Sequence, residues 1–350
     1  MSFKIDLLKH TLNINNADAF LLISDTNRFW ATEFASSAGY VLATKKIVYL
    51  FLDKRYYQKA VDTITDVNIK IVCFTSKNQI LECLRENNVE TLMVEKEYFF
   101  FDDYLYVKND IKNIISFPSD VLRIQKTEYE IYNTQRACDI TCEMMNWIQE
   151  QDLIGLTEIE VANMITTHML KLGATKNSFD PIVASGKNGA YPHHRPSKKI
   201  IEDNEFITVD AGCIYNGYCS DVTRTFPIGI PNKELIEAYK AVYHSNSLGL
   251  QTAAYKMYGK DVDKLCRDVI KSYGYSEFFV HGTGHGVGIN IHELPNVNAS
   301  YEGKLENNSI VTIEPGIYIP GLGGIRIEDM VLIKKDSSIW MTEKGKRWVF

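Results

Sequence analysis

The sequence predicts an α+β protein made of two domains, a smaller α/β domain at residues 1–120 and a larger domain at residues 121–350. Three observations support this prediction. Up to about residue 118, short apolar runs alternate with helical patterns, as they do in compact α/β domains. Beyond residue 123, long helical patterns are separated by strand-like segments in which polar and apolar residues alternate. Between the two halves, the stretch Ser116-Phe117-Pro118-Ser119-Asp120 is suited to a junction.

The smaller domain is expected to alternate strands with helices along the chain. Apolar runs predict strands at residues 19–23, 47–52 and 69–74. Helical patterns cover residues 54–63 and 78–86.

The larger domain is expected to begin with two helices. Residues 123–151 predict one long helix. Thr157 and Glu160 have the spacing of a capping box, which predicts the start of a second helix that stops near Gly173.

Two further helices are expected later in this domain. One starts after Asn232 and ends by Gly259, and the other covers about residues 262–274. The strands between the helices are expected to form a mixed sheet with helices packed on one side.

Composition excludes several classes of protein. Hydrophobic residues make up 45% of the chain and charged residues 23%, so a sizeable core is expected. A net charge of −6, with dispersed lysine and arginine, argues against nucleic acid as a partner. No apolar run is long enough to span a membrane, and Asp6 stands where a signal peptide would be apolar, so a cytoplasmic protein is expected. The seven cysteines contain no CxxC pair and are expected to be reduced and mostly buried.

A predicted hairpin is the first segment whose residues indicate a chemical function. Residues 206–215 and 218–226 are strand-like and flank Asn216-Gly217, the dipeptide that favours a two-residue type I′ turn. Such a turn fixes the register, so Asp210 and Asp221 are expected to be diagonal neighbours on one face. Diagonal neighbours lie roughly 7 Å apart, which lets both carboxylates reach a pair of metal ions about 3.5–4 Å apart. On its own, the pattern also fits a solvated hairpin with two surface aspartates.

The remaining candidate residues follow in three short segments. His281, His285 and His292 lie within a glycine-rich stretch in which the backbone can approach a ligand closely. Glu314 ends an apolar strand, and Glu328 lies on a strand-like segment with Arg326 two residues before it on the same face. An acid among buried residues is costly unless it is paired or bound to metal. An Arg326–Glu328 surface pair is the simpler alternative for the last segment.

Five of these residues resemble the ligand set of a two-metal hydrolase: Asp210, Asp221, His285, Glu314 and Glu328. Four carboxylates and one imidazole suit two divalent ions, with Mn²⁺ favoured and Zn²⁺, Co²⁺ or Fe²⁺ also compatible. Such a pair activates water near neutral pH and polarises a carbonyl. The HExxH zinc signature, the GxGxxG fingerprint, the P-loop and the GxSxG elbow are all absent from the sequence.

The motifs around these residues resemble those of the "pita-bread" metallopeptidases, which comprise Xaa-Pro aminopeptidases, prolidases and methionine aminopeptidases. The resemblance covers roughly residues 123–350 and fills all five ligand positions. It rests on Asp210-Ala211-Gly212, Ser220-Asp221-Val222-Thr223-Arg224-Thr225-Phe226, His281-Gly282-Thr283-Gly284-His285-Gly286-Val287-Gly288, His292-Glu293-Leu294-Pro295, Thr312-Ile313-Glu314-Pro315-Gly316 and Gly324-Ile325-Arg326-Ile327-Glu328.

Further segments are similar to the proline-directed branch of this family. Asn188-Gly189-Ala190-Tyr191-Pro192-His193 resembles the segment that carries an additional active-site histidine, here His193 rather than His194. Residues 27–30, 36–40 and 53–56 resemble the small N-terminal domain of prolidase-like members. The resemblance implies a curved, mostly antiparallel catalytic sheet with outer helices, preceded by that smaller domain.

By this resemblance the chain is expected to be an Xaa-Pro aminopeptidase, which hydrolyses the bond between an N-terminal residue and a following proline. Two divalent ions are expected on the five ligands, and a homodimer is expected because relatives are usually dimers or larger. The residues given catalytic roles, in stabilising the tetrahedral intermediate, transferring protons or orienting a carboxylate, are His193, His281, His292, Glu314 and Arg326.

Other functions remain open at this point. A prolidase, which cleaves only the Xaa-Pro dipeptide, shares every motif. A methionine aminopeptidase is disfavoured by the N-terminal domain and by the His193 segment. A creatinase-like enzyme that works without metal, and a non-catalytic binding protein, are both disfavoured by the intact ligand set.

Overall fold

The computed structural model describes residues 2–350, so Met1, the first residue of the predicted smaller domain, lies outside the described part. The chain divides into two compact units, Met1–Arg123 and Ile124–Phe350. The boundary predicted between residues 120 and 121 stays a prediction.

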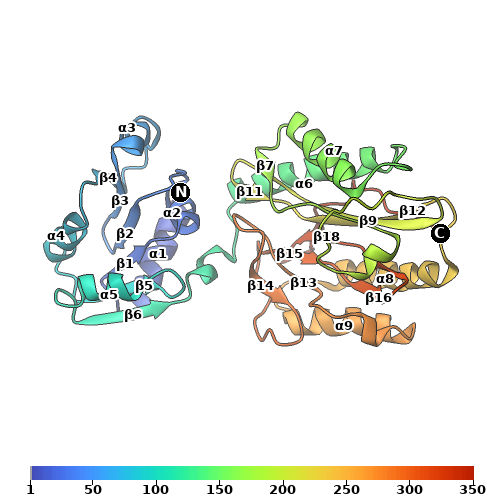
Figure 1. Ribbon diagram of the computed structural model, residues 1–350. Coiled ribbons are helices and arrows are strands. Elements are labelled where there is room, and N and C mark those ends of the chain that lie inside the picture. Colours follow the sequence, from blue (N-terminus) through green and yellow to red (C-terminus); the bar gives the residue numbers. More distant parts are fainter. Residues whose placement is uncertain (1) are drawn as a thin grey trace. The chain divides into compact units, whose positions relative to one another are not determined.

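The first unit is built on one six-stranded sheet with the strand order β4-β3-β2-β1-β5-β6 (Figure 1). Strand β1 pairs antiparallel with β2 and parallel with β5, so the sheet is mixed. Its elements are α1 (Ser2–Ile14), β1 (Ala19–Leu22), α2 (Asp25–Thr32), β2 (Tyr40–Thr44), β3 (Val48–Leu52), α3 (Lys54–Thr63), β4 (Ile69–Cys73), α4 (Asn78–Glu86), β5 (Thr91–Glu95), α5 (Phe101–Val107), β6 (Asn113–Phe117) and a 3-10 turn (Ser119–Arg123).

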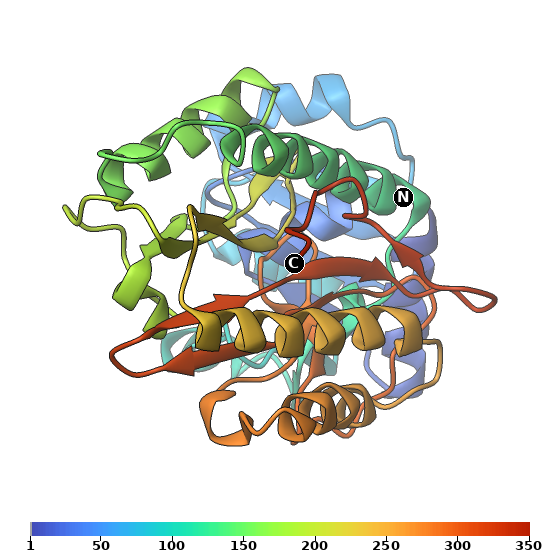
Figure 2. The ribbon, with the colours of Figure 1, turned by 90° about the vertical axis from the view of Figure 1, so that its right-hand side faces the viewer.

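The second unit contains small antiparallel sheets between two pairs of helices (Figure 1), so the expectation of a mixed sheet with helices on one side is wrong. In both views, α6 and α7 lie on one side of the strands and α8 and α9 on the other (Figures 1 and 2). Its elements are α6 (Glu128–Ile148), α7 (Glu158–Lys171), β7 (Lys176–Asn177), β8 (Ile182–Ser185), a 3-10 turn (Gly186–Ala190), β9 (Glu205–Ala211), β10 (Cys213–Tyr215), β11 (Tyr218–Cys219), β12 (Val222–Ile228), α8 (Lys233–Thr252), α9 (Gly259–Ser272), a 3-10 turn (Ser276–Phe278), β13 (Gly284–Gly286), β14 (Glu293–Val297), β15 (Ile310–Ile313), β16 (Gly316–Ile319), β17 (Gly323–Arg326), β18 (Asp329–Leu332) and β19 (Ile339–Trp340).

Each helix pair buries the outer face of a different group of strands. Apolar residues of α6 and α7 share a core with Ile207, Val209 and Ala211 of β9. Residues of α8 and α9 pack on β16 and β17, including Ile317 and Ile325. The inner faces of the strands are therefore left for polar side chains.

The first helix of this unit begins later than the sequence predicted. The prediction placed its start at Arg123, but α6 begins at Glu128. Thr127 caps it, because its hydroxyl accepts a hydrogen bond from the Glu130 amide while the Glu130 carboxylate accepts one from the Thr127 amide. This capping box has the same spacing as the one at Thr157, which the structure does contain at the head of α7.

The last strand-like segment is also interrupted. Arg326 and Glu328 were expected to lie on one continuous strand, but β17 ends at Arg326 and β18 begins at Asp329. In the gap, the amide of Glu328 donates to the carbonyl of Thr223 on β12, 3.1 Å away. Glu328 therefore lies where three strands meet.

Two expectations from composition can be compared with the structure. All seven cysteines are unpaired thiols, and all except Cys73 are buried. Among residues 2–350, no helix is long and apolar enough to cross a membrane.

Candidate metal centre and active-site cavity

A cavity of about 490 Å³ opens on the inner face of the second unit. Its lining includes the five residues predicted to bind metal and the four others predicted to act in catalysis, which are Asp210, Asp221, His285, Glu314, Glu328, His193, His281, His292 and Arg326. Side chains from segments more than a hundred residues apart in the sequence are thus brought to one place.

The predicted hairpin supplies the first two acids. Asn216 and Gly217 both have positive φ, 48° and 89°, as a type I′ turn requires. Asp210 pairs with Thr223 in the predicted register. The ladder breaks near Gly212, where an added Cβ would lie 1.9 Å from the carbonyl oxygen of Ser220. The two strands approach too closely at this point for any residue except glycine, and the register is the same on both sides of the break.

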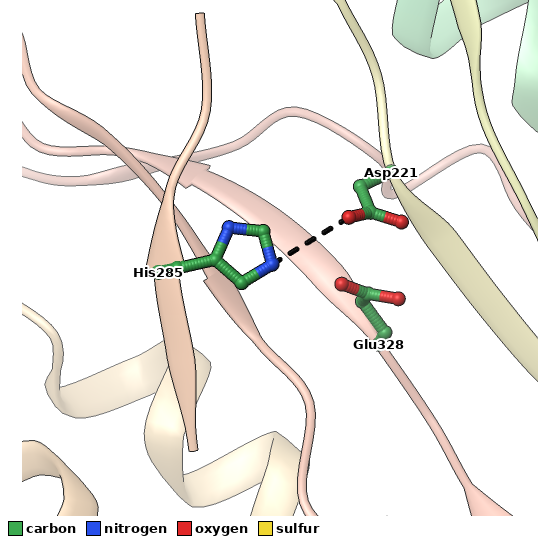
Figure 3. A group of neighbouring side chains, drawn as sticks. All are labelled: Asp221, His285 and Glu328. Atoms are coloured by element: carbon green, nitrogen blue, oxygen red, sulfur yellow. Dashed lines mark ion pairs between the residues drawn. The ribbon is translucent and has the colours of Figure 1, made fainter. Parts of the chain in front are cut away.

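Asp221, His285 and Glu328 form the tightest group in the cavity (Figure 3). One ligand atom from each lies within 4.8 Å of the others. The His285 Nε2 atom lies 3.6 Å from Asp221 Oδ2 and 3.4 Å from Glu314 Oε1. His285 Nδ1 lies 3.0 Å from the carbonyl oxygen of Gly286, which can only accept, so this nitrogen carries the ring hydrogen. The lone pair of Nε2 is therefore directed at the acids, as in a metal-bound histidine.

The negative charge of the buried acids in this cavity is not fully compensated by the protein. Burial, and then the negative charges of neighbouring carboxylates, raise the pKa of Asp221 and of Glu328 well above the usual range. Asp210 Oδ1 and Glu328 Oε1 are buried and have no hydrogen-bond donor among the described residues. Buried charged oxygens without donors are costly, and oxygen-coordinated divalent cations would remove that cost. The donor set of four carboxylates and one imidazole therefore fits a pair of such ions.

Arg326 is a buried cation beside these acids. Its Nη2 donates to Asp210 Oδ2 at 2.7 Å, and its Nε donates to the Thr223 hydroxyl at 3.2 Å. The alternative of an Arg326–Glu328 surface pair is wrong, because Arg326 is buried and its carboxylate partner is Asp210. Arg326 thus orients one carboxylate and leaves the second oxygen of Asp210 free to bind a cation.

Tyr318 joins Arg326 to His281, and the sequence reasoning missed it. Arg326 Nη1 donates to the Tyr318 hydroxyl at 2.7 Å, and that hydroxyl lies 2.8 Å from His281 Nε2. Alternation along β16 could have revealed this tyrosine, since Ile317 and Ile319 both pack into the core and Tyr318 points to the opposite face.

The histidines predicted to act on substrate differ in their surroundings. His281 Nδ1 lies 2.8 Å from the carbonyl of Gly282, so both of its ring nitrogens are engaged within the protein. Burial lowers the pKa of His281, which keeps the ring neutral near pH 7. His292 packs edge to face against the His285 ring, with 4.4 Å between centroids. His193 is exposed on the cavity wall, whereas His194 Nε2 lies 2.8 Å from Glu158.

Arg224 supports the backbone beneath Glu328. Its guanidinium donates to the Glu328 carbonyl at 2.6 Å and pairs with Asp329 at 2.7 Å. It also donates to the carbonyls of Gly345 and Lys346, at 3.0 and 3.1 Å. The segment after β19 therefore completes the support of a residue in the cavity.

Two family models match the sequence. The model of metallopeptidase family M24 matches residues 133–335, and that of the Creatinase/Prolidase N-terminal domain matches residues 4–124. A "Putative Xaa-Pro aminopeptidase" of Mycoplasma genitalium is 45% identical over 346 residues, which cover 98% of each chain. An Xaa-Pro dipeptidase of Pyrococcus furiosus is 34% identical over 348 residues, again 98% of each chain. The solved structure of an Xaa-Pro dipeptidase from Bacillus anthracis superposes with a TM-score of 0.94 at 34% identity and covers 100% of this chain and 99% of its own.

Proposed function

This chain belongs to metallopeptidase family M24, and from that premise we propose that it is an Xaa-Pro aminopeptidase, which releases an N-terminal residue from a following proline. It is a metal-dependent peptidase with the predicted pita-bread fold, which follows a Creatinase/Prolidase N-terminal domain in the sequence. The predicted family and α+β fold class are confirmed.

One observation in the structure carries the proposal. Four carboxylates and His285 converge in one cavity, and two buried carboxylate oxygens there have no protein donor among residues 2–350. Neither a creatinase-like reaction without metal nor a pure binding function would explain why these buried acids lack hydrogen-bond donors. The choice of proline as the second residue comes from the Xaa-Pro substrates named for the relatives.

The five side chains proposed to hold two metal ions are Asp210, Asp221, His285, Glu314 and Glu328. When bound, such ions activate water near neutral pH and polarise the scissile carbonyl. We favour Mn²⁺, because the set is rich in hard carboxylate oxygens.

The proposed catalytic side chains either act on the peptide or hold the residues that do. His193 and His292 line the cavity and would donate hydrogen bonds to the carbonyl oxygen as it gains negative charge. Glu314 would carry a proton toward the departing proline nitrogen. Arg326 fixes Asp210, and Tyr318 ties His281 to Arg326, so His281 acts in this arrangement by holding its neighbours.

Turnover of two peptides tests the proposal. Metal-stripped protein with Mn²⁺ added back is given Ala-Pro and Ala-Pro-Pro-Gly, and cleavage of the longer peptide is expected. His285→Ala should lose metal and activity together, and full activity in this variant would contradict the ligand assignment. Failure to cut either peptide with any divalent metal would overturn the proline-directed function, and a methionine-start peptide would be tried next.

An Xaa-Pro dipeptidase is the second candidate. It is favoured by the names of two of the relatives, from Pyrococcus furiosus and Bacillus anthracis. Cleavage of Ala-Pro alone would establish it. We also propose that the protein acts as a cytoplasmic homodimer, and light scattering after size-exclusion chromatography tests the dimer.

A further inference from the structure

A fully buried carboxylate outside the proposed metal centre holds one wall of the cavity. Glu158 is the first residue of α7, and its side chain has no exposed surface. Six hydrogen bonds reach it, three to each oxygen. They come from the Ser185 amide (2.8 Å), the Ser185 hydroxyl (2.9 Å) and Asn188 Nδ2 (3.0 Å) on Oε1, and from His194 Nε2 (2.8 Å), the Ser197 amide (3.0 Å) and the Ser197 hydroxyl (2.7 Å) on Oε2.

These donors come from both ends of one loop. Ser185 ends β8 and Asn188 lies in the 3-10 turn that follows, whereas His194 and Ser197 lie after the turn. The backbone of α7 adds to the attachment, because the amide of Ile159 donates to the Ser197 carbonyl at 3.3 Å. A single carboxylate at the head of α7 therefore closes residues 185–197 into a fixed loop.

The last part of the loop, from Pro192 to Arg195, lines the cavity. His193 and Arg195 flank His194 in the sequence, and all three line the cavity. The carbonyl of Pro192 accepts from Arg326 at 3.3 Å, and Arg326 binds Asp210. A shift of His194 would therefore move groups that meet the substrate without moving any proposed metal ligand directly.

The charge of Glu158 is well compensated. Burial alone would raise its pKa, but the hydrogen bonds from His194, Ser185, Asn188 and Ser197 outweigh burial and lower the pKa to about 2. The carboxylate is thus ionised at any pH at which a peptidase of this kind would be assayed. A satisfied buried network of this kind is rigid.

We propose that Glu158 is a positioning residue of this peptidase, which acts through His194 to hold the loop of His193 and Arg195 against the substrate. This inference rests on the proposed function for its kinetic test. It assigns His194 the role of a hydrogen-bond donor to Glu158, separate from His193 on the cavity wall.

Variants at His194 test the proposal while leaving Glu158 in place. His194→Ala removes the donor, and His194→Gln keeps an N–H donor near the position of Nε2. We expect kcat/KM for the Xaa-Pro peptide to fall about tenfold to a hundredfold in His194→Ala, because small misplacements of substrate-facing groups cost this much. His194→Gln should regain most of the activity. Metal content, measured by mass spectrometry, should equal that of wild type in both.

A second readout does not depend on the peptidase reaction. Lys198 is exposed directly after the loop, and trypsin should cut after it faster in His194→Ala and in Glu158→Gln than in wild type. Glu160→Gln is the matched control, since Glu160 lies on the same turn of α7, is exposed and forms its hydrogen bonds with Thr157 at the helix start. It should leave both cleavage and kcat/KM unchanged.

The outcomes separate the two proposals. Wild-type kinetics and trypsin resistance in His194→Ala would overturn the positioning role, as would a His194→Gln variant as impaired as His194→Ala. A wild-type protein that cuts no Xaa-Pro peptide would overturn the proposed function, and trypsin susceptibility would still decide whether Glu158 holds the loop.

Discussion

Two groups of buried acids in the same unit differ in how their charge is satisfied. Glu158 has six hydrogen bonds from the protein, and its pKa is lowered. Glu328 is also buried, but it accepts from the Thr223 hydroxyl on one oxygen and has no donor on the other among residues 2–350, and its pKa is raised. Burial therefore does not by itself mark a ligand. A buried acid that has hydrogen-bond donors on both oxygens stabilises the local structure. A buried acid with an oxygen that lacks a donor is available to bind a cation.

The largest effect is expected when an unsatisfied acid is made neutral. Glu328→Gln should lower kcat/KM by roughly a thousandfold or more, because it removes a ligand from the reaction centre. The same variant should unfold at a higher temperature than wild type when both are metal-free, because one uncompensated buried charge is gone. Glu343→Gln, at an exposed position, is the control. A metal-free Glu328→Gln that unfolds earlier than wild type would contradict the comparison.

Adding metal should reverse that order of stability. At a Mn²⁺ concentration of a hundred times Kd, a ligand specific to the folded state stabilises it by about 2.7 kcal/mol. Wild type should gain this stability, and Glu328→Gln should gain much less. Differential scanning fluorimetry across a Mn²⁺ titration measures both, and equal gains in the two proteins would argue against Glu328 as a ligand.

Replacing Glu158, the acid that has a full set of hydrogen-bond donors, should destabilise the protein. The size of this loss should depend on pH. The pKa of Glu158 falls from its ordinary value of 4.5 to about 2 on folding, so its contribution is present above pH 4.5 and is lost as pH falls toward 2. Glu158→Gln should lower the free energy of unfolding at pH 6 by on the order of 2 kcal/mol, because the charge is lost while the glutamine keeps part of the hydrogen bonding. Urea unfolding at pH 6 and at pH 3.5 should show the difference from wild type shrinking at the lower pH. A difference that is the same at both pH values would mean that the charge of Glu158 is not responsible.

The smallest effect is expected at the exposed acid next to Glu158. Glu160 completes the capping box with Thr157, and its exposed carboxylate accepts hydrogen bonds from the Thr157 amide and hydroxyl. Glu160→Gln should lower the melting temperature far less than Glu158→Gln, because a glutamine at this position still accepts from the Thr157 amide. A shift as large as that of Glu158→Gln would remove the distinction between the two positions.

Local patterns in the sequence predicted much of the fold. Asn216-Gly217 fixed the register of β9 and β12, which placed Asp210 and Asp221 on one face. Helices α3 and α4 begin and end where the periodicity predicted. The start of α6 was missed although Thr127 and Glu130 have the spacing of a capping box.

What the sequence did not reveal depends on contacts between distant segments. In the sequence, Glu158 looks like an ordinary acidic residue at the start of a helix. Its hydrogen-bond partners lie 27 to 39 residues further along the chain. Arg326 reads as a partner for Glu328, but the strand break after Arg326 and the close approach of β9 direct its guanidinium to Asp210. Periodicity assigns a residue to a face, and only the packed chain determines which charges meet there.

The bonds of Arg224 set an order of events during biosynthesis. The chain leaves the ribosome from its N-terminus, so Asp210 and Asp221 emerge long before Glu328. Arg224 stays incompletely bonded until Gly345 and Lys346 have also emerged. The hairpin can form early, but we expect the proposed metal centre to be complete only when nearly all of these 350 residues have been made. A nascent chain halted before Gly345 should therefore bind Mn²⁺ poorly, and we expect metal binding to be one of the last steps in the maturation of the protein.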